Sequence, residues 1–414
     1  MIALFSLSLD FSLCSYAAFR RPSSTKTLRG MLLDEHRRGR KAREYSSDSS
    51  ASVESSCSNT TSDKSTYDPS SSSSSTQAPL PPPSFRFFLA ASYLGKPAAS
   101  SPSASSFTFA PDNPVRKWRD KLLDHHGRYA KTLAGKGKGK QKESPSAGDD
   151  FFFFFHHQQP SDGDEHASPT IFGVADGVGG WSESGVDPSI FSQALMYHAY
   201  QAASAGRTAD EQTGTVYPHD ILRQAYEGVL KEEDVVAGSS TACIITLDAQ
   251  KGLMRAANLG DSSFAICRSL RVVHSQPSQV HYFNCPFQLS KTPKNSKNAA
   301  NSITNQPFQA DLFETKVEDG DLILAYTDGF GDNVWMQEVE EMVKHVKGEK
   351  SQGQDLVEEL ADAAVTYAKL CSEKTDKQSP FELEARRNNL LYNGGKVDDI
   401  CVIVALVEKI KKDS

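Results

Sequence analysis

Short apolar runs of strand length alternate with longer helical patterns over most of the chain after residue 84. The runs are bounded by turn-sized gaps, which predicts short antiparallel strands. The strands are expected at 85–93, 170–176, 241–247, 253–258, 264–267, 271–274, 322–326 and 400–407, with the four from 241 to 274 forming a meander. Apolar residues at helical spacing predict helices after Asp187 and at 220–232, 336–346 and 355–371. Helices that arrive in pairs between groups of antiparallel strands predict a layered α+β domain.

Composition divides the chain into regions that differ in their capacity to form a core. Residues 45–83 are a Ser-, Thr- and Pro-rich tract that buries too little apolar surface to offset its ordering entropy, so disorder is predicted there. One domain is expected over 84–410, interrupted by low-complexity insertions at about 97–145 and 290–308.

The first 44 residues combine an apolar start with a basic, serine-rich run that follows it. Seven arginines lie between Arg20 and Arg43, a composition typical of organelle transit peptides. A secretory signal would place its charged region before the apolar stretch, and that stretch, with Asp10 inside it, is too short and polar for a membrane span. We predict a targeting leader and import into the mitochondrial matrix, with a cytoplasmic protein as the alternative.

Charge and cysteine content narrow the compartment and the partners. The formal net charge is −7, and no basic stripe is interleaved with aromatic residues, so nucleic acid is not expected as a partner. The 7 cysteines include no Cys-x-x-Cys pair, and several lie in apolar strands, where a reduced thiol acts as a small hydrophobic group. The cysteine pattern favours a reducing intracellular compartment. A monomer without a stable membrane span is expected.

Three strand-like apolar runs are bounded by aspartates. Asp176 and Asp328 each end a run and precede a glycine, and Asp398-Asp399 precede the last run. A carboxylate at the tip of a buried strand is held rigidly at the rim of a sheet, and several such rims together form a hard-oxygen metal site. Two ions about 3.5 to 4 Å apart stabilise both oxygens of an in-line displacement at phosphorus. The sequence therefore favours a magnesium or manganese enzyme.

Each polar motif also has a purely structural interpretation. An isolated Asp-Gly is most often a turn, and Asp319-Gly320 is interpreted in that way, as is Gly260-Asp261 taken alone. Asp149-Asp150 precede five phenylalanines, and their charges could equally serve to prevent aggregation of this hydrophobic strand. His156-His157 lack the second spaced Cys/His pair of a zinc site.

Taken together, the motifs resemble those of the metal-dependent type 2C (PPM) family of protein serine/threonine phosphatases. In chain order they are Gly148-Asp-Asp150, Val174-Ala-Asp-Gly-Val-Gly-Gly-Trp181, Gly238-Ser-Ser-Thr-Ala242, Asn258-Leu-Gly-Asp-Ser262, Thr327-Asp-Gly-x-x-Asp-Asn333 and Asp398-Asp-Ile400. Ser184-Gly-Val-Asp-Pro188 and the segment from His281 to Leu289 are similar to the mitochondrial Ptc-seven-like branch. The resemblance implies a four-layer α-β-β-α sandwich of two antiparallel sheets flanked by helices.

The resemblance also implies a metal site, residue by residue. Asp176 would bridge two Mg²⁺ or Mn²⁺ ions, the Gly177 carbonyl would bind one of them, and Asp328 and Asp398 would complete the catalytic set. Asp150 would bind an ion or support a ligand, and Asp261 and Asp332 would hold a weaker third ion. The implied metal ligands are Asp150, Asp176, Gly177, Asp261, Asp328, Asp332, Asp398 and Asp399.

The implied reaction is hydrolysis of phosphoserine and phosphothreonine by a hydroxide that bridges the two ions, without a phosphoenzyme. Phosphoproteins, among them mitochondrial metabolic enzymes, are the expected partners. The alternative is an inactive phosphatase fold used as a binding or regulatory module. The acidic set argues against it, because a binding module has no need to keep like charges crowded together.

A cysteine phosphatase is disfavoured because the Cys14-to-Arg20 spacing lies in the leader and lacks phosphate-binding glycines. Candidates for the group that binds the substrate phosphate are Arg86, Lys96, Lys140 and Lys142.

Overall fold

The computed structural model describes residues 84–97, 109–126, 146–156, 169–205, 215–293, 303–349 and 351–411. All of them belong to one compact unit of the chain, residues 77–414. The leader expected at 1–44 and the disordered tract expected at 45–83 lie outside the described residues, as do Lys140, Lys142 and His157.

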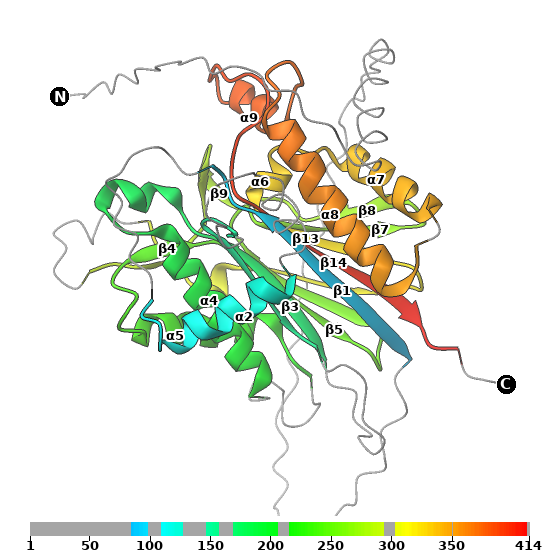
Figure 1. Ribbon diagram of the computed structural model, residues 1–414, viewed down its shortest axis with the longest axis horizontal. Coiled ribbons are helices and arrows are strands. Elements are labelled where there is room, and N and C mark those ends of the chain that lie inside the picture. Colours follow the sequence, from blue (N-terminus) through cyan, green and yellow to red (C-terminus); the bar gives the residue numbers. More distant parts are fainter. Residues whose placement is uncertain are drawn as a thin grey trace, which may run out of the picture. The chain divides into compact units, whose positions relative to one another are not determined.

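Two five-stranded antiparallel sheets pack face to face (Figure 1). The first has the order β1 (Phe85–Leu94), β14 (Ile400–Lys409), β13 (Leu322–Tyr326), β7 (Ser263–Arg268) and β8 (Arg271–Ser275). The second has the order β12 (Asp311–Lys316), β6 (Leu253–Leu259), β5 (Ala242–Asp248), β3 (Thr170–Asp176) and β2 (Asp150–Phe155). Apolar side chains from both sheets form one core.

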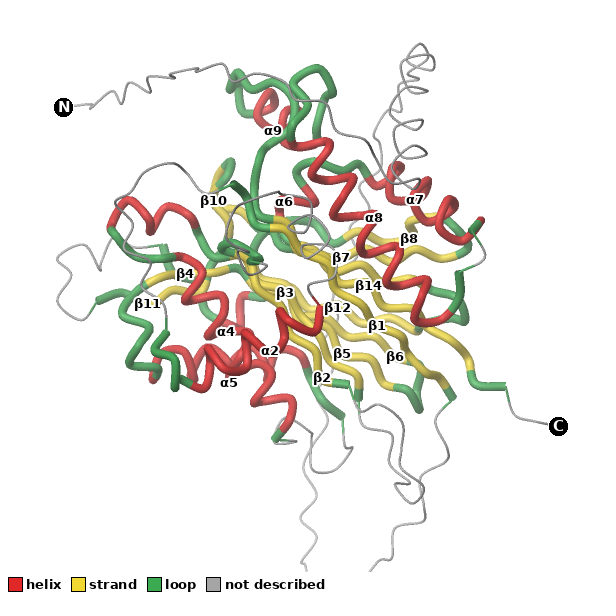
Figure 2. The backbone as a smooth tube through the Cα atoms, in the orientation of Figure 1, coloured by secondary structure: helices red, strands yellow, loops and turns green. Residues whose placement is uncertain are grey.

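Helices cover the outer face of each sheet (Figure 2). The helices α7 (Met336–Gly348) and α8 (Gly353–Ser372) lie on the first sheet. The helices α4 (Pro188–Ser204) and α5 (Pro218–Lys231) lie on the second. Strands β13 and β14 therefore have a helix layer or the other sheet on each face, and this explains why they are continuous apolar runs, buried throughout from 400 to 407. The predicted α+β class and four-layer sandwich are confirmed.

Shorter elements surround these layers. They are η2 (Gly179–Ser184), β4 (Gly238–Ser240), β9 (Val280–Tyr282), β10 (Cys285–Pro286), β11 (Leu289–Lys291), η4 (Pro307–Gln309), α6 (Asp328–Gly331) and α9 (Pro380–Arg387). The start of α4 follows the sequence signal, because the Asp187 carboxylate accepts a hydrogen bond from the Ser189 N–H at 3.0 Å and Pro188 opens the helix.

The predicted meander from 241 to 274 is wrong at its centre. Strands β5 and β6 pair in one sheet, and β7 and β8 pair in the other. The chain crosses between the sheets at 260–262, because β7 pairs with the buried strand β13 rather than with β6. Gly260-Asp261 is thus the crossing point and not a hairpin turn. Strand β12, which pairs with β6, was not predicted, because its side chains are mostly exposed and give no apolar run.

The segment 97–145, expected to be a low-complexity insertion, contains the helix α2 (Pro114–His126). Trp118 on this helix packs against Phe151, Tyr197 and Tyr200, with ring centroids 5.5 to 5.7 Å apart. The second expected insertion, 290–308, is also partly built into the fold, since the Gln288 N–H donates to the buried Asn305 Oδ1 at 3.0 Å.

No helix in the described part of the chain has the length and apolarity needed to cross a bilayer.

Candidate active site

The strand order brings six aspartates to one end of the sandwich. In the second sheet, Asp150 at the start of β2 pairs directly with Asp176 at the end of β3. In the first sheet, β13 ends where β14 and β7 begin, since Tyr326 pairs with Val402 and with Ser263. The residues that flank these strand ends are Asp261, Asp328, Asp398 and Asp399. We call this end of the sandwich, with Asp149 and Asp332 beside it, the acid rim.

Asp150 is buried at 1% exposure and is held by Thr327. The Thr327 hydroxyl donates to Asp150 Oδ2 at 2.7 Å and accepts from the Cys401 N–H at 3.0 Å. The other carboxylate oxygen, Oδ1, is buried without a hydrogen-bond partner. A buried carboxylate oxygen without a donor is costly unless a cation satisfies it.

The turn after Asp176 is fixed by backbone contacts. The Asp176 N–H donates to Thr241 Oγ1 at 3.0 Å, and the Asp176 carbonyl accepts from the Ser240 hydroxyl at 2.8 Å. A side chain at Gly177 would lie 2.4 Å from the Pro188 carbonyl oxygen, so only glycine fits this close approach. The backbone that carries the Asp176 side chain is thus fixed by its neighbours.

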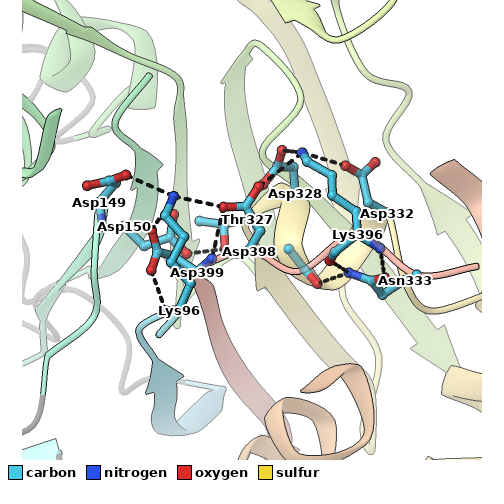
Figure 3. A network of polar contacts seen from close by, with 12 residues as sticks. Lys96, Asp149, Asp150, Thr327, Asp328, Asp332, Asn333, Lys396, Asp398 and Asp399 are labelled. Atoms are coloured by element: carbon cyan, nitrogen blue, oxygen red, sulfur yellow. Dashed lines mark hydrogen bonds and ion pairs between the residues drawn. The ribbon is translucent and has the colours of Figure 1, made fainter. Parts of the chain in front are cut away.

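Two lysines lie among the carboxylates of the acid rim (Figure 3). Lys396 Nζ lies 2.5 Å from Asp328 Oδ2, 2.9 Å from Asp332 Oδ2 and 3.1 Å from Asp398 Oδ2. Lys96 Nζ lies 3.0 Å from Asp149 Oδ2, 3.1 Å from Asp398 Oδ1 and 3.0 Å from Asp399 Oδ2.

The backbone places the segments of Asp328 and Asp399 in direct contact. A side chain at Gly329 would lie 1.9 Å from the Asp399 carbonyl oxygen. Asn333 joins the same two segments, since its Nδ2 donates to the Gly329 and Lys396 carbonyls at 2.9 and 2.8 Å.

Burial and the crowding of like charges shift the pKa values of several acid-rim aspartates. Burial, followed by repulsion from neighbouring aspartates, raises the pKa of Asp150, Asp176 and Asp261 well above the ordinary range. Burial also raises the pKa of Asp332 to about 6, although Lys396 opposes the shift. Burial acts on Asp398 in the same direction, but Lys396 and Lys96 outweigh it and hold the pKa of Asp398 below its ordinary value. The rim carries more negative charge than its own lysines neutralise.

These residues fit a hard divalent cation. Asp150 Oδ1 and Asp261 Oδ1 are both buried without hydrogen-bond partners, and carboxylate oxygens are the ligands that Mg²⁺ and Mn²⁺ prefer. Within the described ranges, no three carboxylate, imidazole or thiol groups already converge as a metal site. Ammonium groups contact both oxygens of Asp398 and one oxygen of Asp328.

Comparison with known proteins adds an independent observation. No protein-family model matches the chain. The PTC7 homolog fig of Drosophila grimshawi is 38% identical over 250 residues, which cover 59% of this chain and 77% of that protein. The human PTC7 homolog is 37% identical over 244 residues, which cover 58% of this chain and 76% of that protein. The chain belongs to the PTC7 family of protein phosphatases.

A solved structure supports the PTC7 assignment at the level of fold. The X-ray structure of the photosystem II phosphatase PBCP matches with a TM-score of 0.52 and 25% identity, over 79% of this chain and 99% of that chain. As a PTC7-family member, the chain is a protein serine/threonine phosphatase of the PPM type. The resemblance predicted from the sequence is confirmed.

The structure of this PTC7-family chain places all eight predicted site residues at the acid rim; their role as metal ligands stays a prediction. It also adds residues that sequence reasoning missed. Lys396 is absent from the predicted site residues, although it lies only two positions before Asp398. Thr327 was noted only as part of a motif, and its contact with Asp150 joins residues 177 positions apart. His156 Nδ1 contacts Thr170 Oγ1 at 2.8 Å, and among the described residues no group of three His, Cys or acidic side chains around it forms a zinc site.

Proposed function

We propose that this PTC7-family phosphatase hydrolyses phosphoserine and phosphothreonine in proteins with two Mg²⁺ or Mn²⁺ ions held at the acid rim, and a weaker third ion beside Asp261 and Asp332. The observation that supports this proposal most directly is the excess of negative charge at the acid rim. Within the described residues, eight aspartates meet two lysines there, and two carboxylate oxygens are buried without partners. A bound divalent cation would relieve this repulsion and satisfy the two unpaired oxygens.

Bound Mg²⁺ or Mn²⁺ supplies water activation and neutralises charge that develops on the phosphate. Asp176 would hold metal, because it lies where the carboxylates of both sheets meet: burial, followed by the charges of Asp328, Asp150 and Asp398, raises its pKa. The Gly177 carbonyl is the proposed neighbouring ligand. Thr327 keeps Asp150 in place, and the rigid strand ends orient the acids before substrate arrives.

Lys96 is the proposed group that binds the substrate phosphate. It follows β1 at the acid rim, and its side chain is 39% exposed, so the ammonium reaches solvent. Arg86, in contrast, lies near the start of β1 and forms an ion pair with Glu408 at 2.7 Å. Of the two candidates that the structure describes, Lys96 alone is at the site. A positioned cation at this point orients the phosphate for in-line attack.

The test is release of phosphate from a phosphothreonine peptide by the full chain, with Mn²⁺ or Mg²⁺ and with EDTA. We expect turnover with metal and its loss in EDTA. A folded protein that shows no turnover with any divalent metal would instead be the binding or regulatory module. Turnover that persists in EDTA after dialysis would reject metal-dependent chemistry.

We propose the mitochondrial matrix as the location and phosphoproteins, including metabolic enzymes, as the partners of a monomer. Support for the location comes from the arginine- and serine-rich composition of residues 1–44. A fluorescent protein fused to residues 1–44 should enter mitochondria, and the same fusion with its seven arginines changed to glutamine should not. A cytoplasmic signal from the first fusion would contradict the proposal.

A further inference from the structure

Lys396 is the more enclosed of the two lysines at the acid rim. Its side chain is 16% exposed, against 39% for Lys96. Its ammonium lies 2.5 Å from Asp328 Oδ2, 2.9 Å from Asp332 Oδ2 and 3.1 Å from Asp398 Oδ2. The side chain is therefore a cation enclosed by three carboxylates.

The backbone holds Lys396 in this position. Its N–H donates to Asn333 Oδ1 and its carbonyl accepts from Asn333 Nδ2, both at 2.8 Å. Its ammonium also lies 5.2 Å from the centre of the Phe381 ring, at the start of α9. These contacts place the ammonium between Asp328 and Asp332 (Figure 3).

The two parts of the acid rim consequently differ in how their carboxylates are satisfied. Asp398 has an ammonium on each oxygen, at 3.1 Å to Lys96 and 3.1 Å to Lys396. Asp150 Oδ1 and Asp261 Oδ1 are buried without hydrogen-bond partners. An ion that binds Asp328 and Asp398 must therefore replace or share the contacts of Lys396, whereas an ion at Asp150 displaces no ammonium there.

We infer that Lys396 is an internal counter-ion that competes with the divalent metal for Asp328, Asp332 and Asp398. It stabilises the metal-free protein and lowers the affinity for metal at this part of the rim. The inference rests on the proposed metal-dependent function. It adds a specific consequence, which is that this side chain sets the metal concentration at which the phosphatase becomes loaded.

The test is calorimetric titration of the metal-free full chain with Mn²⁺, together with melting temperatures with and without Mn²⁺. Lys396→Met removes the charge and keeps the length, and Lys396→Arg keeps the charge. Lys377→Met is the matched control, because Lys377 is also enclosed, at 17% side-chain exposure. It forms an ion pair of 2.6 Å with Glu338, which is not part of the acid rim.

We expect Lys396→Met to bind Mn²⁺ about tenfold more tightly, since removal of a nearby charge pair changes binding by one or more kcal/mol. Its metal-free form should melt below the wild type, and the gain on adding Mn²⁺ should be larger. Lys396→Arg should keep the wild-type affinity. Lys377→Met should lower both melting temperatures equally and leave the Mn²⁺ affinity unchanged.

Unchanged or weaker Mn²⁺ binding by Lys396→Met would overturn the inference and would show that Lys396 positions the carboxylates. If that variant does not stay folded without metal, Lys396→Gln, which keeps hydrogen-bond donors without the charge, is titrated under the same criterion. A wild type that binds no Mn²⁺ would reject the proposed function itself, so the two failures are distinguishable.

Discussion

The two ends of β13 carry buried aspartates in opposite electrostatic settings. Asp321, before the strand, is fully buried and accepts two bonds from Arg268, at 2.9 and 2.8 Å, and one from the Glu318 N–H at 2.8 Å. Asp328, after the strand, is also buried, and the Lys396 ammonium that it contacts is shared with two other aspartates. Burial is common to both ends, so the balance of charge is what distinguishes a functional carboxylate from a structural one.

The largest effect is expected when one of the acid-rim aspartates loses its charge. Asp176→Asn should lower the turnover of a phosphothreonine peptide by roughly 1000-fold, the scale for loss of a preorganised electrostatic group. Its melting temperature should stay the same or rise, because one of the repelling charges is gone. Kinetics and thermal melting on the same preparation check both.

Asp319→Asn is the matched control, because it changes an Asp-Gly outside the acid rim. Asp319 Oδ1 accepts a hydrogen bond from the exposed Lys409 N–H at 2.8 Å, so only a small stability loss is expected. If both variants lose the same activity, the acid rim is not the catalytic centre.

Removing the charge of Asp321, at the other end of β13, should lower stability and leave activity unchanged. Asp321→Asn breaks a bidentate pair with Arg268, whose side chain is 27% exposed. Solvent around Arg268 moderates the loss, so we expect a decrease of roughly 1–3 kcal/mol in the free energy of unfolding. The turnover number per folded molecule should not change. Urea denaturation measures the first quantity, and a strong loss of turnover in the folded enzyme would remove the contrast between the two ends.

Thr327 lies beside Asp328 and links the two sheets, so its removal should affect both stability and activity moderately. Thr327→Val deletes the donor to Asp150 and the acceptor for the Cys401 N–H while keeping the shape. The expected cost is about 1–3 kcal/mol in unfolding free energy. Turnover should fall about tenfold, because Asp150 loses its support. Thr327→Ser should restore most of both; a serine variant as impaired as valine would count against the hydrogen bond.

The smallest effect concerns pH and lies away from the acid rim. His274 on β8 stacks on Phe313 of β12, with ring centroids 4.1 Å apart. Burial lowers the pKa of His274 below its ordinary value, so its contribution to stability is present above pH about 6.5 and is lost as the pH falls below that value. His274→Phe should therefore lose less melting temperature than the wild type between pH 7 and pH 5.5. Identical pH profiles would exclude His274 as a contributor.

Much of the fold was predictable because the central strands are buried on both faces and appear as uninterrupted apolar runs. The same property made Asp176, Asp328 and Asp398 recognisable in the sequence as acids at strand ends. Helix α2 was missed because charged residues interrupt its pattern, and the partners of Trp118 come from β2 and α4. Lys396 was missed because its position two residues before Asp398 does not reveal its contacts with Asp328 and Asp332, which are 68 and 64 residues away in the chain.

The most direct measurement is the calorimetric titration of the metal-free full chain and of Asp176→Asn with Mn²⁺ in the absence of substrate. A metal centre at the acid rim predicts two tightly bound ions per wild-type chain, with the third ion binding more weakly. It also predicts a large loss of affinity in the variant, whose fold is preserved. If the wild type binds no Mn²⁺, or if Asp176→Asn binds it with the same affinity and stoichiometry, the acid rim is not the metal centre.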